Sequence, residues 1–342
     1  MTTINGNNQA QGTKPANESS GKPTVFSEIV TGRLATIIPE TRAQATKPRS
    51  FIDTHVHLMK TSLYSWFNSS KPATFEGPWD PLFAMGNFTD TQLAQEAQGT
   101  PVDLKGAVHI QANADDPIAE IEAVEAMAAR SAWPIRIVGG GDLSDPDIES
   151  LLEREASFAD VRGVRQNLNI HPHPLYNYVD KSYMDDPQWL KGLALLKKYA
   201  MSFDMQLYPT QFARACEVIG ANPETLFIID HAGMWADRDL GGWQLWSKGL
   251  ADLAERSNCV IKISALASLD HRWTLESIKP IVYTILDAFD TDRVMFGSNF
   301  PVDKLHGTYG DIIHGFVRCV ETLSEPEQNA LFVSNAKRWY RF

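Results

Sequence analysis

Cysteine is scarce in this sequence. Its 342 residues include three cysteines, Cys216, Cys259 and Cys319, which lie far apart and form no CxxC pair. Because their number is odd and their spacing wide, they indicate no disulfide framework. We expect them to be buried reduced thiols in an intracellular, cytoplasmic protein.

Long apolar runs and clusters of basic residues are also missing. No stretch approaches 18 consecutive apolar residues, so no transmembrane helix is expected. The N-terminus lacks the charged-then-apolar pattern of a secretory signal. The net charge is −11, from 31 Lys and Arg against 42 Asp and Glu, which argues against nucleic-acid or anionic-membrane partners. The expected partner is a small-molecule substrate, and a homodimer is left open.

What the sequence does contain is a repeated alternation of apolar, β-rich runs with helical patterns. Eight runs read as strands, and helical patterns lie between them. The runs are 50–57, 106–111, 135–139, 161–167, 202–208, 226–231, 260–264 and 293–298. Helices are expected over 187–200, 211–220, 243–256, 275–289, 311–323 and 326–338.

Two further helices carry a start signal. Asp116 is followed by Pro117 and an apolar stripe, and Asp145 is followed by Pro146 in the same way. A capping residue followed by proline at the first helical position is typical of a helix N-terminus. We therefore predict helices that begin at these two prolines.

Eight strands that alternate with helices predict an α/β fold, a (β/α)8 barrel of the TIM type, because parallel strands need crossover connections. An open doubly wound sheet is the alternative. It normally carries a glycine-rich phosphate turn after the first strand, whereas residues 58–60 contain no glycine and 139–141 lack the GxGxxG spacing. We assign the barrel to residues 49–342. Residues 1–48, which begin with a polar segment, are predicted to be a flexible tail and arm.

The connection after the first strand is unusually long, from Leu58 to about Leu104. It contains six large aromatic residues: Tyr64, Trp66, Phe67, Phe75, Trp79 and Phe83. Long loops in compact domains are usually lids or binding loops. Two interpretations stay open: substrate contact, for which Trp79 is the candidate, and an aromatic cluster that covers the end of the barrel.

The first strand has the most informative pattern. In Phe51-Ile52-Asp53-Thr54-His55-Val56-His57, the residues Asp53, His55 and His57 fall on one face, because successive strand side chains point to opposite faces. Two imidazoles so placed at a strand end can converge on a divalent metal or on a polar group of a substrate. Hydrogen-bonded histidines of an ordinary strand are the structural alternative.

Polar residues also end the later strands, where the active sites of such barrels lie. The candidates are His109, Gln111, Arg165, Asp204, Gln206, Tyr208, His231, Lys262, Ser264, Asn299 and Asp303. His109 is interpreted as a core histidine, and Lys262 as the partner of a buried carboxylate, Asp204 or Asp53. Arg165 fits either an ion network or a clamp for a substrate carboxylate.

With these residues placed, the chain resembles the amidohydrolase superfamily, and within it the amidohydrolase-related branch that contains sugar-lactone and pyrone-dicarboxylate lactonases. The matching pieces run in order from 53–57 and 108–113 through 163–166, 230–233 and 262–264 to 296–301 and 335–340. The resemblance covers about residues 50–340 and implies a (β/α)8 barrel.

The resemblance implies either one divalent ion, Zn²⁺, or no metal. Mononuclear members hold the ion with the residues that match His55 and His57, sometimes with the one that matches His231, and with an aspartate at the end of strand eight. This chain has Asn299 at that position. A neutral amide ligates weakly and cannot act as a base. Asp303 and Asp204 are the candidates to replace the missing carboxylate.

The leading hypothesis is a hydrolase that opens a lactone or similar cyclic ester of a small carboxylated substrate. Water oriented by His231 and a carboxylate attacks the carbonyl, and His55 and His57 stabilise the oxyanion. Arg165, Gln111, Gln206, Tyr208 and Trp79 are predicted to contact the substrate. The alternatives are a metal-assisted decarboxylase and a non-catalytic binding barrel.

Overall fold

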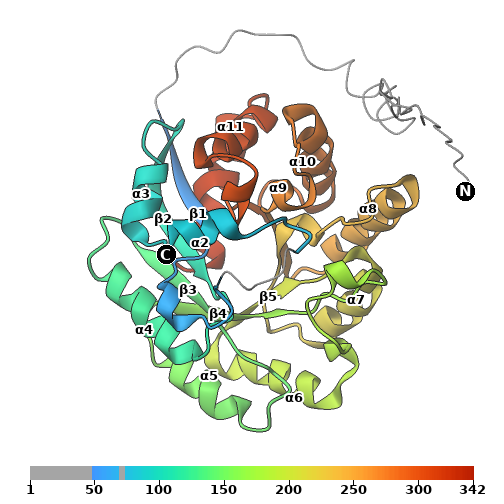
Figure 1. Ribbon diagram of the computed structural model, residues 1–342. Coiled ribbons are helices and arrows are strands. Elements are labelled where there is room, and N and C mark those ends of the chain that lie inside the picture. The colour runs from blue at the N-terminus through green and yellow to red at the C-terminus, as the bar shows by residue number, and fades with distance from the viewer. Residues whose placement is uncertain (1–47, 69–73) are drawn as a thin grey trace, which may run out of the picture. The chain divides into compact units, whose positions relative to one another are not determined.

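The computed structural model describes residues 48–68 and 74–342, and its core is a ring of eight parallel strands (Figure 1). Each strand pairs with the next one along the chain, in the order β1 to β8. The strands are β1 (Arg49–Val56), β2 (Val102–Ile110), β3 (Ile135–Gly140), β4 (Val161–Asn167), β5 (Ser202–Gln206), β6 (Phe227–Ile229), β7 (Cys259–Ile263) and β8 (Val294–Phe296). The predicted (β/α)8 fold is confirmed, and all eight predicted runs contain a strand.

The ring closes where the segment after β8 runs beside β1. Val56 and Phe300 form a parallel bridge. Backbone hydrogen bonds extend this seam, because Asn299 N–H donates to His55 O and His57 N–H donates to Phe300 O, each at 2.8 Å. The Ser298 N–H also donates to the Asp53 carboxylate at 2.8 Å. The first strand is therefore fixed to the end of the last one.

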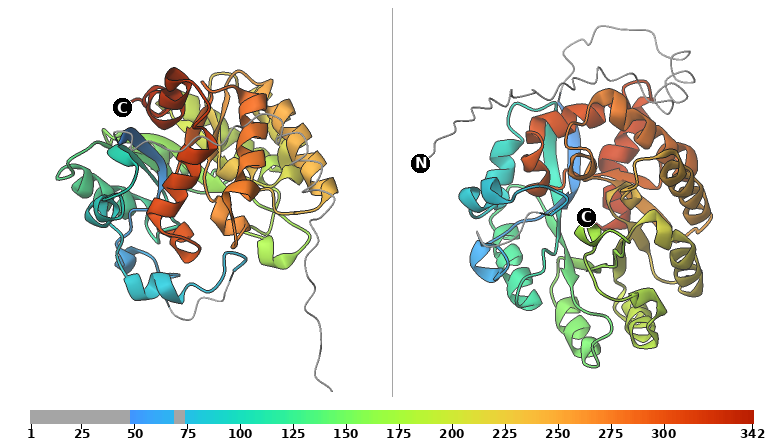
Figure 2. Two further views of the ribbon diagram at one scale, coloured as in Figure 1. Left: turned by 90° about the horizontal axis from the view of Figure 1, so that it is seen from above. Right: turned by 45° about the vertical axis from the view of Figure 1, so that its right-hand side comes forward.

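Helices surround the strands, as the two views of Figure 2 show. Those that follow successive strands are α4 (Pro117–Ala128), α5 (Ile148–Ala156), α6 (Pro187–Leu195), α7 (Phe212–Ala221), α8 (Leu240–Ala254), α10 (Leu275–Phe289) and α11 (Tyr309–Cys319). Shorter ones are α2 (Asp80–Met85) and α3 (Asp90–Glu96) in the long first connection, α9 (Leu266–Leu269), α12 (Glu325–Asn329) and α13 (Asn335–Trp339). The helices bury their apolar stripes against the strands, which themselves are buried almost throughout.

One of the two predicted helix starts is correct and the other is wrong. Asp116 caps α4, since its carboxylate accepts from the Ile118 N–H at 2.9 Å. Asp145 instead accepts from the Asp147 N–H at 2.8 Å and forms a turn, so that α5 begins at Ile148. An Asp-Pro pair favours a turn as well as a cap, and here the turn is formed.

Three other expectations concern the cysteines, membrane-spanning helices and the N-terminal residues. Cys216, Cys259 and Cys319 are buried free thiols, as predicted. Across residues 48–68 and 74–342, every helix is too short or too polar to traverse a lipid bilayer. Residues 1–47 of the predicted tail lie outside the described residues, and the division at residue 48 stays a prediction.

Two helical glycines allow a matched test of the packing. A Cβ on Gly192 in α6 would lie 2.0 Å from the backbone oxygen of Leu143, whereas a Cβ on Gly220 in α7 would meet nothing within 4 Å. We expect Gly192→Ala to lower the free energy of unfolding by about 1–3 kcal/mol through overpacking. Gly220→Ala should raise it by about 0.5–1 kcal/mol, because alanine is the better helix former. Urea denaturation of both variants measures this, and equal effects would contradict the packing.

Candidate active site

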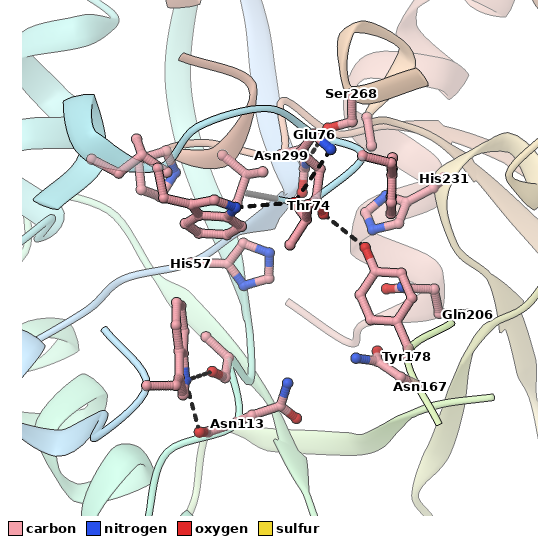
Figure 3. Close-up of a pocket in the computed structure, with 18 of the residues that line it drawn as sticks. His57, Thr74, Glu76, Asn113, Asn167, Tyr178, Gln206, His231, Ser268 and Asn299 are labelled. Carbon is pink, nitrogen blue, oxygen red and sulfur yellow. Dashed lines mark hydrogen bonds between the residues drawn. The ribbon is translucent and has the colours of Figure 1, made fainter. Parts of the chain in front are cut away.

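A cavity of about 430 Å³ opens at the carboxyl ends of the strands (Figure 3). Its polar floor comes from five strands or the segments that follow them, and its wall is largely aromatic. The floor includes His57, Arg165, Gln206, His231 and Asn299, and the wall includes Trp66, Phe67, Phe75, Trp79 and Tyr178. Four wall residues belong to the long first connection, so this loop both contacts the cavity and covers the barrel end.

Three imidazoles lie together at the floor. The His55 ring centroid is 5.1 Å from that of His57 and 4.4 Å from that of His231. Burial lowers the pKa of His231 to about 3 and holds the pKa values of His55 and His57 well below the usual range. Desolvation disfavours the charged ring, so all three imidazoles are neutral near pH 7.

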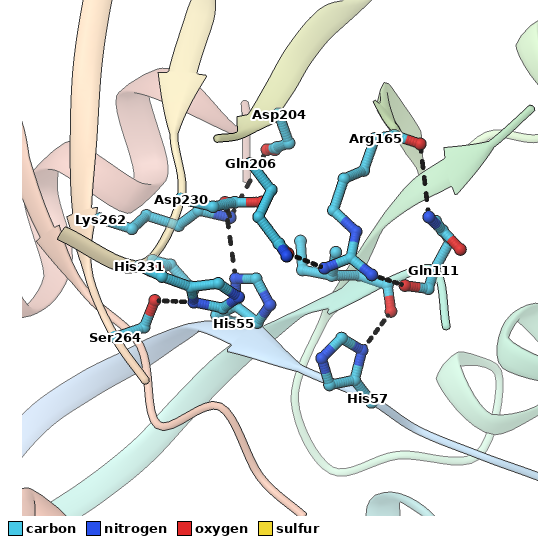
Figure 4. A network of polar contacts seen from close by, with 12 residues as sticks. His55, His57, Gln111, Arg165, Asp204, Gln206, Asp230, His231, Lys262 and Ser264 are labelled. Atoms are coloured by element: carbon cyan, nitrogen blue, oxygen red, sulfur yellow. Dashed lines mark hydrogen bonds and ion pairs between the residues drawn. The ribbon is translucent and has the colours of Figure 1, made fainter. Parts of the chain in front are cut away.

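Each imidazole is oriented by a neighbour (Figure 4). His57 Nδ1 donates to Ile110 O at 2.8 Å, which leaves Nε2 as an acceptor. His231 Nδ1 lies 2.9 Å from Ser264 Oγ. His55 Nδ1 lies 3.6 Å from the Asp230 carboxylate, and the ring is fully buried below the cavity.

Below the imidazoles, Lys262 joins two carboxylates in the barrel interior. Its ammonium is 2.7 Å from Asp230 and 3.5 Å from Asp204, and all three side chains are inaccessible to solvent. Tyr340 donates to Asp204 at 2.7 Å. Burial alone would raise the pKa of Asp230, but Lys262 together with the neighbouring His55 and His231 outweighs it and holds this pKa well below the usual range. Burial raises the pKa of Asp204 to about 7.

Arg165 borders the cavity with part of its hydrogen-bonding capacity free. Nη1 donates to Gln206 Oε1 at 3.0 Å, and Nη2 donates to Gln111 O at 2.8 Å. Nε has no hydrogen-bond partner within the described residues. This nitrogen is buried, but the charged guanidinium of Arg165 lines the cavity and can attract an anion or a carbonyl oxygen there.

Asn299 is held by a buried carboxylate. Its Nδ2 donates to Asp303 Oδ1 at 2.8 Å, and Ser268 Oγ donates to the same oxygen at 2.7 Å. When Asp303 is ionised it accepts only, so the amide turns its nitrogen to Asp303 and its oxygen away from it. Burial raises the pKa of Asp303 to about 7.

Five predicted site residues do not line this cavity, and His55, which is buried below it, is one of them. Asp204 is held in the interior by Lys262 and Tyr340, and Asp303 lies behind Asn299. Gln111 supports Arg165 through its backbone oxygen, and Tyr208 donates to Tyr176 O at 2.8 Å in an aromatic cluster. Neither carboxylate is therefore placed to reach a substrate in the cavity. The remaining predictions, His57, His231, Asn299, Arg165, Gln206 and Trp79, do line it.

His109 occupies the core position expected for it. Its Nδ1 accepts from the Leu58 N–H at 3.1 Å, and Nε2 lies 3.4 Å from Glu120. Glu120 also accepts from Tyr64 and from the Ala112 N–H. This group links the start of the long connection to α4 and does not line the cavity.

Sequence reasoning missed the cavity residues contributed by loops. Glu76 and Thr74 come from the first connection, and Tyr178 and Asn167 from the end of β4 and the segment after it. The only sequence signal was the length and aromatic content of the first connection, which singled out Trp79 but no acidic residue.

The predicted metal ligands lie close together without forming a complete site. Within residues 48–68 and 74–342, no three His, Cys, Asp or Glu side chains are grouped so as to hold a metal ion. The position that would supply a carboxylate carries Asn299, whose amide ligates weakly. The donors therefore do not fit a tight zinc site as placed.

Comparison with known proteins decides the family. The sequence model of the amidohydrolase family matches residues 52–342. The chain belongs to the amidohydrolase family. It is an enzyme of the hydrolase type. The uncharacterized protein y4mH of Sinorhizobium fredii is 33% identical over 303 residues, 85% of this chain and 98% of that protein.

Two relatives from Burkholderia multivorans extend the comparison. An L-fucono-1,5-lactonase is 28% identical to this amidohydrolase over 249 residues, 68% of this chain and 79% of the relative. The crystal structure of an amidohydrolase with bound zinc has a TM-score of 0.70 and 24% identity, covering 85% of this chain and 99% of that one. At that identity, the structural likeness shows the shared fold.

The position of Asp303 predicts a pH effect on stability. Its pKa is about 7 in the folded protein against 3.8 for the free side chain, so the folded state binds the proton more tightly. Its contribution to the free energy of unfolding is therefore greatest below pH 4 and is lost as the pH rises through 7. We expect Asp303→Asn, which cannot ionise, to lack this loss in urea denaturation at pH 4 to 8. The same slope in both proteins would contradict the burial of Asp303.

Proposed function

We propose that this amidohydrolase opens a lactone of a small carboxylated substrate. The observation that carries the proposal is the arrangement of neutral His57 and His231 with Arg165 and Asn299 around one cavity at the strand ends. The similarity to an L-fucono-1,5-lactonase supports it. A cavity of about 430 Å³ accommodates a small cyclic ester.

His231 acts as the donor to the lactone carbonyl. When the Ser264 hydroxyl donates to Nδ1, the ring proton resides on Nε2 and is available to the substrate. A pKa of about 3 keeps this imidazole neutral, so it donates a hydrogen bond and does not bring a full charge. The hydrogen bond strengthens as the carbonyl oxygen becomes an oxyanion.

His57 and Arg165 have different roles. His57 Nδ1 is committed to Ile110 O, so its Nε2 accepts a hydrogen bond from the attacking water. In that tautomer, His57 cannot stabilise an oxyanion. His55 does not line the cavity and supports His231 from below. The charged guanidinium of Arg165, which lines the cavity, binds a carboxylate of the substrate through a charge-assisted hydrogen bond.

A lactone panel tests this function. Ring opening releases acid, so a pH indicator follows turnover of L-fucono-1,5-lactone, a pyrone dicarboxylate and dihydrocoumarin, which carries no carboxylate. We expect His231→Ala to lower kcat by about 10²–10³, the usual effect of losing an oxyanion donor. His314→Ala, on the surface of α11, should leave turnover unchanged. Undiminished turnover in the His231 variant would remove its role.

Zinc stays a prediction that the zinc-bound relative supports, although the imidazoles as placed among the described residues are not grouped to hold an ion. Asn299→Asp alone would place a second carboxylate against Asp303, so the informative variant exchanges the two residues, Asn299→Asp with Asp303→Asn. We expect the exchange to raise the affinity for Zn²⁺, measured by equilibrium dialysis and metal analysis, because a carboxylate then ends strand eight. An unchanged affinity would remove position 299 from the ligand set.

Cytoplasmic location and a homodimer also remain proposals. The buried free thiols support the first, because reducing compartments keep cysteines unpaired.

A further inference from the structure

One carboxylate does line the active-site cavity. Within the described part of the chain, Glu76 is the only acidic residue of its wall, and the side chain is 8% exposed. It lies in the first connection, between β1 and α2, and lines the same cavity as Asn299 and His231 (Figure 3).

Glu76 is held in place by contacts from three directions. Tyr178, from the segment after β4, donates its hydroxyl to Oε1 at 2.7 Å. The Thr74 hydroxyl donates to Oε2, and Trp79 Nε1 donates to Thr74 Oγ1 at 3.1 Å. The backbone oxygen of Glu76 accepts from His306 Nε2 at 2.6 Å. A carboxylate so fixed has its orientation set before a substrate arrives.

The contacts leave Glu76 able to accept further hydrogen bonds. A carboxylate offers about four acceptor positions, and Tyr178 and Thr74 occupy one on each oxygen. Both donors are neutral hydroxyl groups, so they orient the carboxylate without cancelling its charge. A water molecule in the cavity can donate to either oxygen.

Lactone hydrolysis needs a group that accepts a proton from water. Among the described residues of the cavity, the Nε2 of His57 and the Glu76 carboxylate are the candidates, whereas the others fail on chemistry or position. Asn299 cannot take a proton, and Asp204 and Asp303 do not line the cavity. We propose that Glu76 is the catalytic general base of this amidohydrolase, supplied by the first connection in place of a carboxylate at the end of strand eight. The inference rests on the lactone hydrolysis proposed above.

The step balances without another reactant. Glu76 takes a proton from water as the water oxygen forms a bond to the lactone carbonyl carbon. The tetrahedral intermediate then collapses, the ring C–O bond breaks, and the leaving alkoxide takes the proton back from the Glu76 carboxyl. The product is a hydroxy acid, and the carboxylate is restored.

A pair of variants separates catalysis from a structural link between two loops. Glu76→Gln keeps the shape but cannot accept the proton, whereas Tyr178→Phe removes the 2.7 Å hydrogen bond and keeps the carboxylate. If Glu76 is the general base, we expect the Gln variant to lose about 10²–10⁴ in kcat, with little change in KM. The Phe variant should lose less than about tenfold. Circular dichroism and thermal melting confirm folding of both.

A second measurement covers a Gln variant that folds poorly. In Glu76→Ala, added formate supplies a carboxylate in the vacated space, and we expect it to restore part of kcat without stimulating the wild type. If Glu76 only links the two loops, added formate should not restore kcat.

The outcomes separate this inference from the proposed function. The role of Glu76 is overturned, and lactone hydrolysis is left standing, by either of two results. In one, the wild type and the Glu76→Gln variant are equally active; in the other, the Gln and Phe variants lose activity equally. A large loss in His57→Asn together with none in Glu76→Gln assigns the base to His57 instead. Wild-type protein that opens no lactone of the panel overturns both.

Discussion

The pairing of Lys262 with Asp230 inside the barrel is the contact on which the site depends. A buried carboxylate is costly unless a cation offsets it, and here the two groups are 2.7 Å apart without solvent access. Asp230 in turn approaches His55 and precedes His231 in the chain, so its position sets two of the three imidazoles. Loss of one partner of such a pair usually costs about 3–5 kcal/mol.

The same burial determines the chemistry above that pair. Desolvation keeps the imidazoles neutral, so they act through hydrogen bonds whose direction the neighbours determine. His57 is an acceptor at Nε2 because its Nδ1–H donates a hydrogen bond to a backbone oxygen. Negative charge reaches the cavity from a loop and positive charge from Arg165, while the strand-eight position contributes a neutral amide.

Strand periodicity was enough to predict the barrel and the polar residues that meet at its carboxyl end. It could not tell which residues reach the cavity. Asp204 and Gln206 share a face of β5, yet of the two only Gln206, which is two residues nearer the carboxyl end of the strand, lines the cavity. The alternation of side chains predicts which face of a strand a residue occupies, but not whether it lies near enough to the carboxyl end to line the cavity. Glu76 could not be predicted from the sequence for another reason, since the path of a long connection depends on tertiary contacts such as those with Tyr178 and His306.

The seam between β1 and the segment after β8 consists of main-chain hydrogen bonds together with the Asp53 carboxylate. None of these contacts uses the side chain of residue 299. The placement of the histidines is consequently decoupled from this side chain: an aspartate can occupy the position while the first strand keeps its course if residue 303 is neutral, and the φ of 59° favours residues such as asparagine and aspartate that tolerate a left-handed backbone. The barrel thus tolerates a change of chemistry at this point without a change of architecture.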